Sequence, residues 1–118
     1  MSQARNVADV APEEAPAAQQ AGETVIIDVR EPAEFAVERI AGALNLPLST
    51  FEPASLLAVV APERILFQCG SGMRSLKAVT ACRLSGFAVD RHLAGGIGGW
   101  KAAGLPTIRI DPATGLPD

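Results

Sequence analysis

One cysteine lies in a glycine-rich loop whose residue types favour nucleophilic chemistry. Residues 69–75 read Cys-Gly-Ser-Gly-Met-Arg-Ser. The loop follows the apolar run Arg64–Phe67, which we expect to be a buried strand, and it enters a helix expected over Ser75–Ser85. Backbone N–H groups at such a helix start, together with Arg74, would favour a thiolate over a thiol and would bind an anion beside it. The sequence therefore predicts that Cys69 is a nucleophile.

The rest of the loop is expected to bind the substrate. Arg74 could instead pair with a nearby carboxylate at the surface, but its position at the end of the loop favours anion binding or bracing of the loop. Ser75 could donate its hydroxyl to the sulfur, could cap the helix, or could do both. The expected substrate-binding residues are Gly70, Ser71, Gly72, Met73, Arg74 and Ser75.

Each cysteine also has a structural alternative, because free cysteine is among the most buried residue types. For Cys69 the neighbouring glycines and the strand-end position argue against a purely structural thiol. Cys82 is expected on the apolar side of the following helix, with Ala78 and Val79. Core packing is therefore favoured for Cys82 over a role as a resolving thiol.

Two charged residues follow a second expected strand and could support the loop. Thr24–Val29 is a continuous β-branched run, typical of a central parallel strand. Asp28 and Arg30 lie at its carboxyl end, where they could order the loop or the substrate. For Arg30 we favour a local ion pair with Glu34 at helical spacing, and we expect Asp28 to be the partner of the loop.

Three further features receive structural interpretations. His92 is the only histidine and is expected to be a solvated surface residue with no chemical role. Gly95-Gly96 is expected to form a tight turn, because Gly-Gly-Ile-Gly-Gly lacks the spacing of a dinucleotide-binding loop. Trp100 is expected to pack the last helix onto the sheet, although it could instead form a wall of the site.

Strands and helices alternate along the chain, which predicts an α/β domain with a mainly parallel sheet. The ligand site of such a sheet lies at the carboxyl ends of its strands, where both Asp28 and Cys69 fall. Thr107–Asp118 is expected to be a loose tail. The expected strands are Val7–Val10, Thr24–Val29, Ala43–Leu46, Arg64–Phe67 and Ala88–Leu93. The expected helices are Pro12–Gln20, Pro32–Val37, Pro53–Val60, Ser75–Ser85 and Ile97–Ala103.

Bulk properties limit the possible partners. The 118 residues suffice for one domain, and the formal charge of −3 with no basic, aromatic-rich stretch excludes nucleic acid as an expected partner. No apolar run approaches the length of a membrane span, so we expect no membrane segment within this chain. With two cysteines and an expected free reactive thiol, a reducing compartment such as the cytoplasm is the expected location.

Three blocks of this sequence resemble the rhodanese family. The first block is Asp28-Val29-Arg30 with Glu34-Phe35, and it continues through Ile40–Pro47. The second block is the cysteine loop, with its Cys-x-x-Gly-x-Arg-Ser pattern. The third block runs from Gly86-Phe87 through Leu93–Trp100. The resemblance covers roughly Val7 to Pro106, which divides the chain into a rhodanese-like domain over 1–106 and a tail over 107–118. One departure from the family is visible: it commonly has Gly-His-Ile where this chain has Glu38-Arg39-Ile40.

The resemblance implies a five-stranded, mainly parallel sheet with helices on both faces, and a thiosulfate-type sulfurtransferase. Cys69 would take the outer sulfur of a small anionic donor such as thiosulfate, forming a persulfide. A thiophilic acceptor such as cyanide, a thiol or a protein would then remove that sulfur. The resemblance implies neither a metal nor an organic cofactor.

Two other functions use the same loop. Cysteine phosphatases that share this fold resemble Cys-x5-Arg, whereas four residues separate Cys69 from Arg74 here, and the smaller loop suits a sulfur atom better than a phosphate. A non-catalytic module that carries or senses sulfur supplied by a partner protein is the other alternative. An intact loop makes it the less favoured one.

Overall fold

The computed structural model describes residues 7–111 and 113–117, and alternating strands and helices account for most of them. The strands are β1 Ala8–Val10, β2 Val25–Asp28, β3 Glu38–Arg39, β4 Leu44–Asn45, β5 Ile65–Gln68, β6 Arg91–Leu93 and β7 Ile108–Arg109. The α-helices are α1 Ala15–Gln20, α2 Pro32–Val37, α3 Pro53–Leu57, α4 Met73–Leu84 and α5 Gly96–Ala102. Short 3₁₀ turns span Pro12–Glu14, Leu48–Thr50 and Pro62–Arg64.

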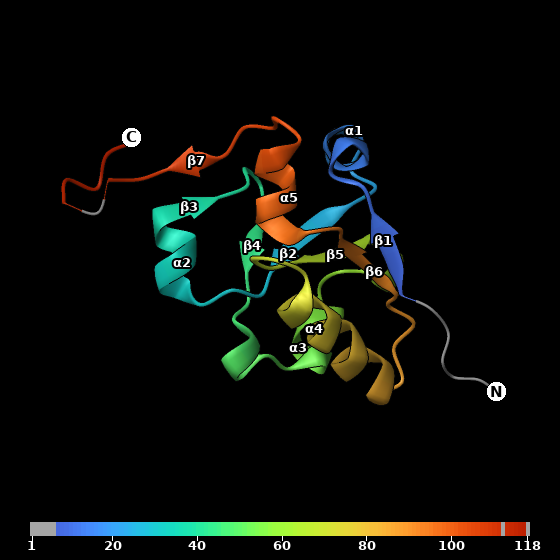
Figure 1. The fold of residues 1–118 in the computed structure, drawn as a ribbon. Helices are drawn as coiled ribbons and strands as arrows, with labels where there is room; N and C mark the ends of the chain where they lie inside the picture. Colours follow the sequence, from blue (N-terminus) through green and yellow to red (C-terminus); the bar gives the residue numbers. More distant parts are fainter. Residues whose placement is uncertain (1–6, 112, 118) are drawn as a thin grey trace.

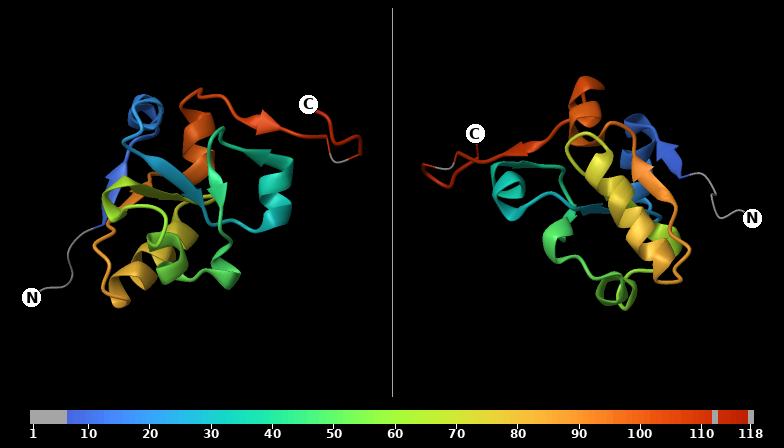
Figure 2. Two further views of the ribbon diagram at one scale, coloured as in Figure 1. Left: turned by 180° about the vertical axis from the view of Figure 1, so that it is seen from behind. Right: turned by 60° about the horizontal axis from the view of Figure 1, so that its bottom comes forward.

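Five strands form one parallel sheet in the order β1-β6-β5-β2-β4 (Figure 1). Helices α1 and α5 lie on one side of this sheet and α3 and α4 on the other, as the opposite views in Figure 2 also show. This arrangement confirms the predicted α/β fold with a five-stranded parallel sheet flanked by helices. The central strands β5 and β2 are buried on both faces, which explains their continuous apolar sequences.

The two faces of the sheet carry separate apolar clusters, because side chains alternate along each strand. On the face toward α3 and α4, Ile27 and Phe67 pack with residues of both helices, including Cys82. On the face toward α1 and α5, Leu66 packs with Trp100, which confirms the predicted role of this tryptophan. Its indole N–H also donates to the carbonyl of Pro106 at 2.8 Å.

Several element boundaries differ from those expected, and two of the differences have a clear local cause. Helix α4 begins at Met73, inside the expected loop, because Gly72 adopts the left-handed conformation (φ 114°) that starts the helix there. Strand β6 begins only at Arg91, since the preceding segment closes α4: the N–H of Phe87 bonds to the carbonyl of Cys82 at 2.9 Å.

The expectation that Thr107–Asp118 is wholly a loose tail is wrong. Ile108–Arg109 forms β7, which pairs antiparallel with β3 in a second, two-stranded sheet (Figure 1). Thr107 adds a hydrogen bond of 2.6 Å from its hydroxyl to the Glu38 carboxylate. These short strands escaped prediction because neither has the apolar alternation of a half-buried strand.

Arg39, which stands where the rhodanese family commonly has histidine, packs locally. Its guanidinium carbon lies 5.0 Å from the centre of the Phe35 ring, and one of its N–H groups contacts the Phe35 carbonyl at 3.4 Å. It therefore joins strand β3 to helix α2. Among the described residues, no helix has the length and apolar character needed to cross a membrane.

Candidate active site

Cys69 directly follows β5, at the carboxyl edge of the parallel sheet, where ligands bind in open α/β sheets. Its side chain points inward and the residue is only 1% exposed. The sulfur accepts the backbone N–H of Gly72 at 3.0 Å, and its own S–H is directed to the Ser75 hydroxyl oxygen at 3.5 Å. The predicted nucleophile thus sits inside the curve of its loop and within reach of helix α4.

Burial opposes ionisation of the Cys69 thiol, but hydrogen bonds from the hydroxyl and backbone of Ser75 and from the backbone N–H groups of Gly72 and Ser71 outweigh it. The pKa of Cys69 is therefore lower than that of an ordinary cysteine. A lowered pKa raises the thiolate population near neutral pH, which is what a nucleophilic cysteine requires.

The loop is closed by a second segment of the chain that sequence reasoning had treated only as a turn. Gly95 and Gly96 do form the expected tight turn, and the N–H groups that follow bond back to the loop: Ile97 to the Cys69 carbonyl at 2.8 Å and Gly98 to the Gly70 carbonyl at 3.1 Å. A Cβ atom on Gly96 would lie 2.2 Å from the Cys69 carbonyl oxygen. Only glycine fits at this approach.

Arg74 is paired with a carboxylate in this structure. Its guanidinium makes two bonds to Glu34 of helix α2, at 2.7 and 3.0 Å. Those hydrogen bonds lower the pKa of Glu34 to about 2, against the opposing effect of partial burial. Arg74 therefore pairs with a carboxylate at the surface, which was one of its two interpretations. The same ion pair braces the end of the cysteine loop against α2.

The expected ion pair between Arg30 and Glu34 is wrong. Arg30 instead makes a buried, bidentate pair with Asp28, with its closest contact at 2.9 Å, and it donates to the Glu38 carbonyl at 2.6 Å. The spacing argument failed because Arg30 precedes α2, so it does not share a helical face with Glu34. Asp28 is committed to Arg30, and Asn45 of β4 bonds the carbonyls of both at 3.0 and 2.9 Å. These supporting residues shape the neighbouring strand end and make no hydrogen bond to the loop among the described residues.

The expectation that His92 is a solvated residue is also wrong. His92 is 8% exposed, and its Nδ1 lies 2.9 Å from the Ser75 hydroxyl oxygen. Its Nε2 lies 2.6 Å from the Asp9 carboxylate of β1. Three side chains in a row thus lead from the surface to the Cys69 sulfur. No local pattern in the sequence indicates this arrangement, because these contacts depend on β1 and β6 being neighbours in the sheet.

Ser75 does not cap α4 with its side chain, since Gly72 occupies the cap position and no side-chain cap bond is present. Its hydroxyl instead faces the Cys69 sulfur, His92 and the Gly72 carbonyl, the last at 3.1 Å. Cys82, by contrast, lies in the apolar cluster below the sheet, as expected, and burial raises the pKa of its thiol to about 11. The two cysteines are therefore chemically distinct.

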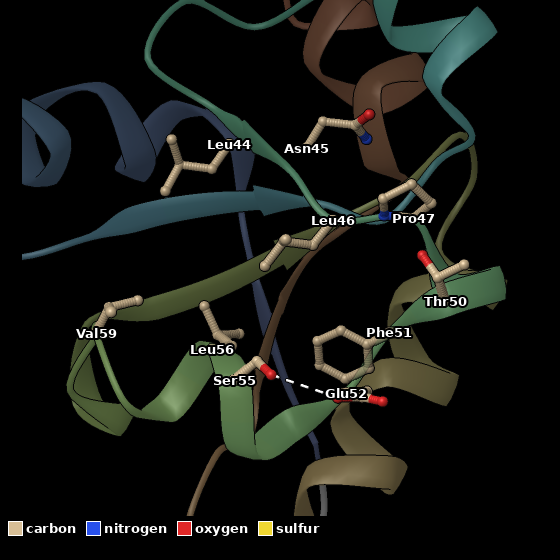
Figure 3. Close-up of a pocket in the computed structure, with 10 residues that line it drawn as sticks. All are labelled: Leu44, Asn45, Leu46, Pro47, Thr50, Phe51, Glu52, Ser55, Leu56 and Val59. Carbon is tan, nitrogen blue, oxygen red and sulfur yellow. Dashed lines mark hydrogen bonds between the residues drawn. The ribbon is translucent and has the colours of Figure 1, made fainter.

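A pocket of about 450 Å³ lies elsewhere, between β4 and α3. Figure 3 shows Leu46, Phe51 and Leu56 around it, and none of the residues that line it belongs to the cysteine loop. Within the loop itself, Ser71 and Met73 are exposed and Gly70 and Arg74 are partly exposed. The exposed rim of the loop, rather than this pocket, is where a small molecule would approach the sulfur.

A parallel α/β sheet with a cysteine-bearing, glycine-rich loop between a central strand and a helix defines the rhodanese-like class. A family model described as Rhodanese-like domain matches residues 11–103. The chain belongs to this family.

Individual relatives agree with this assignment. An uncharacterized protein of Synechocystis sp. is 38% identical over 104 residues, which cover 88% of this chain and 58% of the relative. Thiosulfate sulfurtransferase 16, chloroplastic, of Arabidopsis thaliana is 34% identical over 92 residues, covering 69% of this chain and 77% of that protein. A crystal structure of a protein from Anabaena sp. superposes with a TM-score of 0.74 at 25% identity, covering 88% of this chain and 95% of that one.

The matched relatives differ in length. This chain spans 58% of the Synechocystis protein but 77% of the Arabidopsis enzyme. The shared unit is therefore the rhodanese-like domain, and any activity of this chain must be argued from the residues of that domain.

Proposed function

We propose that this protein is a sulfurtransferase that moves sulfane sulfur from thiosulfate, or a similar small anionic donor, to a thiophilic acceptor through a persulfide on Cys69. The observation that carries the proposal is the Cys69 thiol with a lowered pKa, held by N–H donors at the start of α4. The Arabidopsis relative, named a thiosulfate sulfurtransferase, supports the same chemistry.

In the first step the Cys69 thiolate attacks the outer sulfur of thiosulfate. A new S–S bond forms on Cys69 while the S–S bond of the donor breaks, and sulfite leaves with the bonding electron pair. The backbone N–H groups that face the Cys69 sulfur then stabilise negative charge on the persulfide. The acceptor completes the cycle by attacking the outer sulfur, which returns the thiolate of Cys69.

Loop size supports sulfur rather than phosphoryl transfer. Four residues lie between Cys69 and Arg74, and the N–H of Gly72 already reaches the sulfur at 3.0 Å. A loop closed this tightly around one sulfur atom leaves less room for a tetrahedral phosphate than the longer phosphatase loop. Nothing in the site favours the phosphatase over the sulfurtransferase.

Arg74 is the residue we propose to attract the donor anion. Its side chain is 35% exposed, and its bonds to Glu34 orient the guanidinium next to the loop. A guanidinium is suited to bind the oxygens of thiosulfate. The acceptor would be a thiol, cyanide or a protein, and a reducing compartment such as the cytoplasm would keep Cys69 reduced.

Intact mass spectrometry before and after thiosulfate treatment tests the proposal. The wild-type protein should gain one sulfur atom, and cyanide should then remove it. Cys69→Ser should gain none while remaining folded by circular dichroism. Cys82→Ala is the matched control and should load like the wild type, because the Cys82 thiol is buried and has a raised pKa.

The alternatives give different results in the same experiment. Wild-type protein that gains no sulfur from any small donor, but does gain one from a persulfidated protein, would replace the enzyme with a carrier. Hydrolysis of an aryl phosphate that depends on Cys69, without sulfur loading, would replace it with a phosphatase.

A further inference from the structure

A row of four side chains, Asp9, His92, Ser75 and Cys69, joins three elements of the fold to the cysteine loop. The contacts run from β1 to β6 at 2.6 Å, from β6 to α4 at 2.9 Å, and from α4 to the Cys69 sulfur at 3.5 Å. His92 and Ser75 are both buried, whereas the Asp9 side chain is 70% exposed. The row therefore begins at solvent and ends at the nucleophile.

The ability of each group to donate or accept determines which atoms of the row carry a hydrogen. The Asp9 carboxylate can only accept, so Nε2 of His92 carries a hydrogen and donates to it. In the neutral imidazole Nδ1 is then an acceptor that faces the Ser75 hydroxyl. The Ser75 oxygen in turn accepts from the thiol of Cys69.

We propose that His92 is the base that takes up the Cys69 proton through Ser75, so that the resting nucleophile is a thiolate paired with an imidazolium across one hydroxyl. The S–H bond of Cys69 breaks as its proton moves to the Ser75 oxygen, and the original hydroxyl proton of Ser75 moves to Nδ1 of His92. The electron pair stays on sulfur, the serine hydroxyl is regenerated, and the total charge is unchanged.

The products of this transfer fit the surrounding contacts better than the reactants. The thiolate accepts the hydroxyl of Ser75 and the N–H of Gly72, while the imidazolium donates to Ser75 on one side and to the Asp9 carboxylate on the other. Sulfur, Ser75, His92 and Asp9 then each have the charge or the hydrogen that the next group requires, and the Ser75 hydroxyl donates to the thiolate in place of the Gly72 carbonyl. Asp9 acts at a distance from sulfur, as a positioning residue that holds the imidazolium.

Within the part of the chain that the structure describes, the other charged residues near His92 are directed elsewhere. On its own strand, Arg91 is directed away, donating to the Glu63 carbonyl at 3.0 Å, and Asp90 is exposed. On α4, Arg74 is paired with Glu34. Among the described residues, the ionisable groups in contact with His92 and Ser75 are thus Asp9 from β1 and Cys69 from the loop after β5.

The test measures thiolate rather than sulfur transfer, so it is independent of the sulfurtransferase proposal on which the inference builds. The rate of alkylation of Cys69 by iodoacetamide is followed by intact mass across a pH series. His92→Asn can still bond to Ser75 but cannot take up a proton. It should raise the titration midpoint by about one pH unit and slow alkylation at neutral pH about tenfold, with no change at high pH where all the thiol is ionised.

Asp9→Asn keeps a hydrogen-bond acceptor but removes the charge that stabilises the imidazolium. It should slow alkylation at neutral pH about threefold. Asp90→Asn removes the same charge from an exposed neighbouring position and should match the wild type. Because Asp9 is largely exposed, its variant tests the relay even if His92→Asn fails to fold.

The proposal is overturned if the midpoint of His92→Asn coincides with that of the wild type, or if Asp9→Asn behaves like Asp90→Asn. A rate that falls equally at every pH would also overturn it, since that result indicates a distorted loop rather than a lost base. Sulfur loading of the same proteins by thiosulfate is read separately. Failure of wild-type loading with a shifted alkylation profile would reject the sulfurtransferase and retain the relay.

Discussion

Gln68, one residue before the nucleophile, buries a polar side-chain amide. The residue is 0% exposed, and neither its amide oxygen nor its amide nitrogen has a hydrogen-bond partner within the described part of the chain. Buried amides without partners are costly, because they lose their bonds to water and gain none in exchange. We therefore expect Gln68 to lower the stability of strand β5.

Replacing Gln68 with methionine, which has a similar length and no strong polar group, should raise the free energy of unfolding by about 1 kcal/mol. Urea denaturation of the two proteins provides the measurement. Gln20→Met makes the same chemical change at an exposed position and should alter stability by less than about 0.5 kcal/mol. A loss of stability in Gln68→Met would mean that the amide has a partner, such as a bound water, whose bonds outweigh the cost of burial.

The residue scale also shows where sequence reasoning stops. Cys69 could be predicted because a glycine-rich loop between an apolar run and a helix is a local pattern. His92 could not, since it is 17 positions from Ser75 and 83 from Asp9 in the chain. A lone histidine at a strand end has no local feature that distinguishes a buried relay from a solvated side chain.

At the scale of elements, the start of α5 packs directly against the cysteine loop, and Gly96 is the point of closest approach. Gly96→Ala should destabilise the protein, because the new Cβ would clash with the Cys69 carbonyl and the residue has a φ of +60°. Gly104→Ala is a matched control, with a φ of +80° but no atom within 4 Å of the new Cβ. Both variants place alanine at a positive φ, but only in Gly96→Ala does the new Cβ clash with another atom.

We expect Gly104→Ala to cost about 1 kcal/mol and Gly96→Ala to cost about 1 to 3 kcal/mol more, with slower alkylation of Cys69 as the loop is displaced. Thermal or urea unfolding and iodoacetamide kinetics measure the two effects. Equal losses in the two variants would show that the loop and α5 can separate without cost.

The pair between Arg74 and Glu34 joins α4 to α2, and its contribution should depend on pH. The pKa of Glu34 falls from 4.5 to about 2 in the folded protein, so the stabilisation is complete above the unfolded value of 4.5 and is lost as the pH falls through about 2. Both side chains are partly exposed, which limits the effect at neutral pH to about 1 kcal/mol or less.

Comparing the wild type with Glu34→Gln by urea unfolding at several pH values measures this contribution. The difference between the two proteins should be constant above the unfolded pKa and should shrink toward zero as acid protonates Glu34. Glu63→Gln, which changes an exposed carboxylate, is the control. A difference that is independent of pH throughout this range would exclude the ion pair as its cause.

For the whole molecule, the alternation of apolar runs and helix signals was enough to predict an α/β fold with a mainly parallel sheet, and the resemblance to the rhodanese family implied its five strands. The neighbours of each strand could not be read from local patterns, which say nothing about whether β1 lies beside β6 or beside β2. The contacts that depend on that order, from Asp9 to His92 and from Ile97 to the Cys69 carbonyl, were missed for the same reason. The prediction for Arg30 failed more locally, because helical spacing was applied to a residue that precedes the helix beginning at Pro32.

The small β3–β7 sheet lies outside this arrangement and should be dispensable. Its strands have exposed or half-exposed residues, and the five-stranded sheet is complete without them. Removing residues 107–118 should therefore lower the free energy of unfolding by about 1 kcal/mol or less and leave alkylation of Cys69 unchanged. Urea unfolding and iodoacetamide kinetics test this, and a truncated chain that fails to fold would place the final segment within the domain.

The hydrogen bonds from the start of α5 to the carbonyls of Cys69 and Gly70 should affect how Cys69 reacts while the protein is being synthesised. During synthesis the loop leaves the ribosome well before residues 96–98, and domains generally fold as whole units. Until that last helix docks, the cysteine lacks the framework that shapes its surroundings and should react like an ordinary thiol. We therefore expect activation of the sulfur to depend on the docking of α5, so that Cys69 reacts more slowly in a nascent chain than in the folded domain.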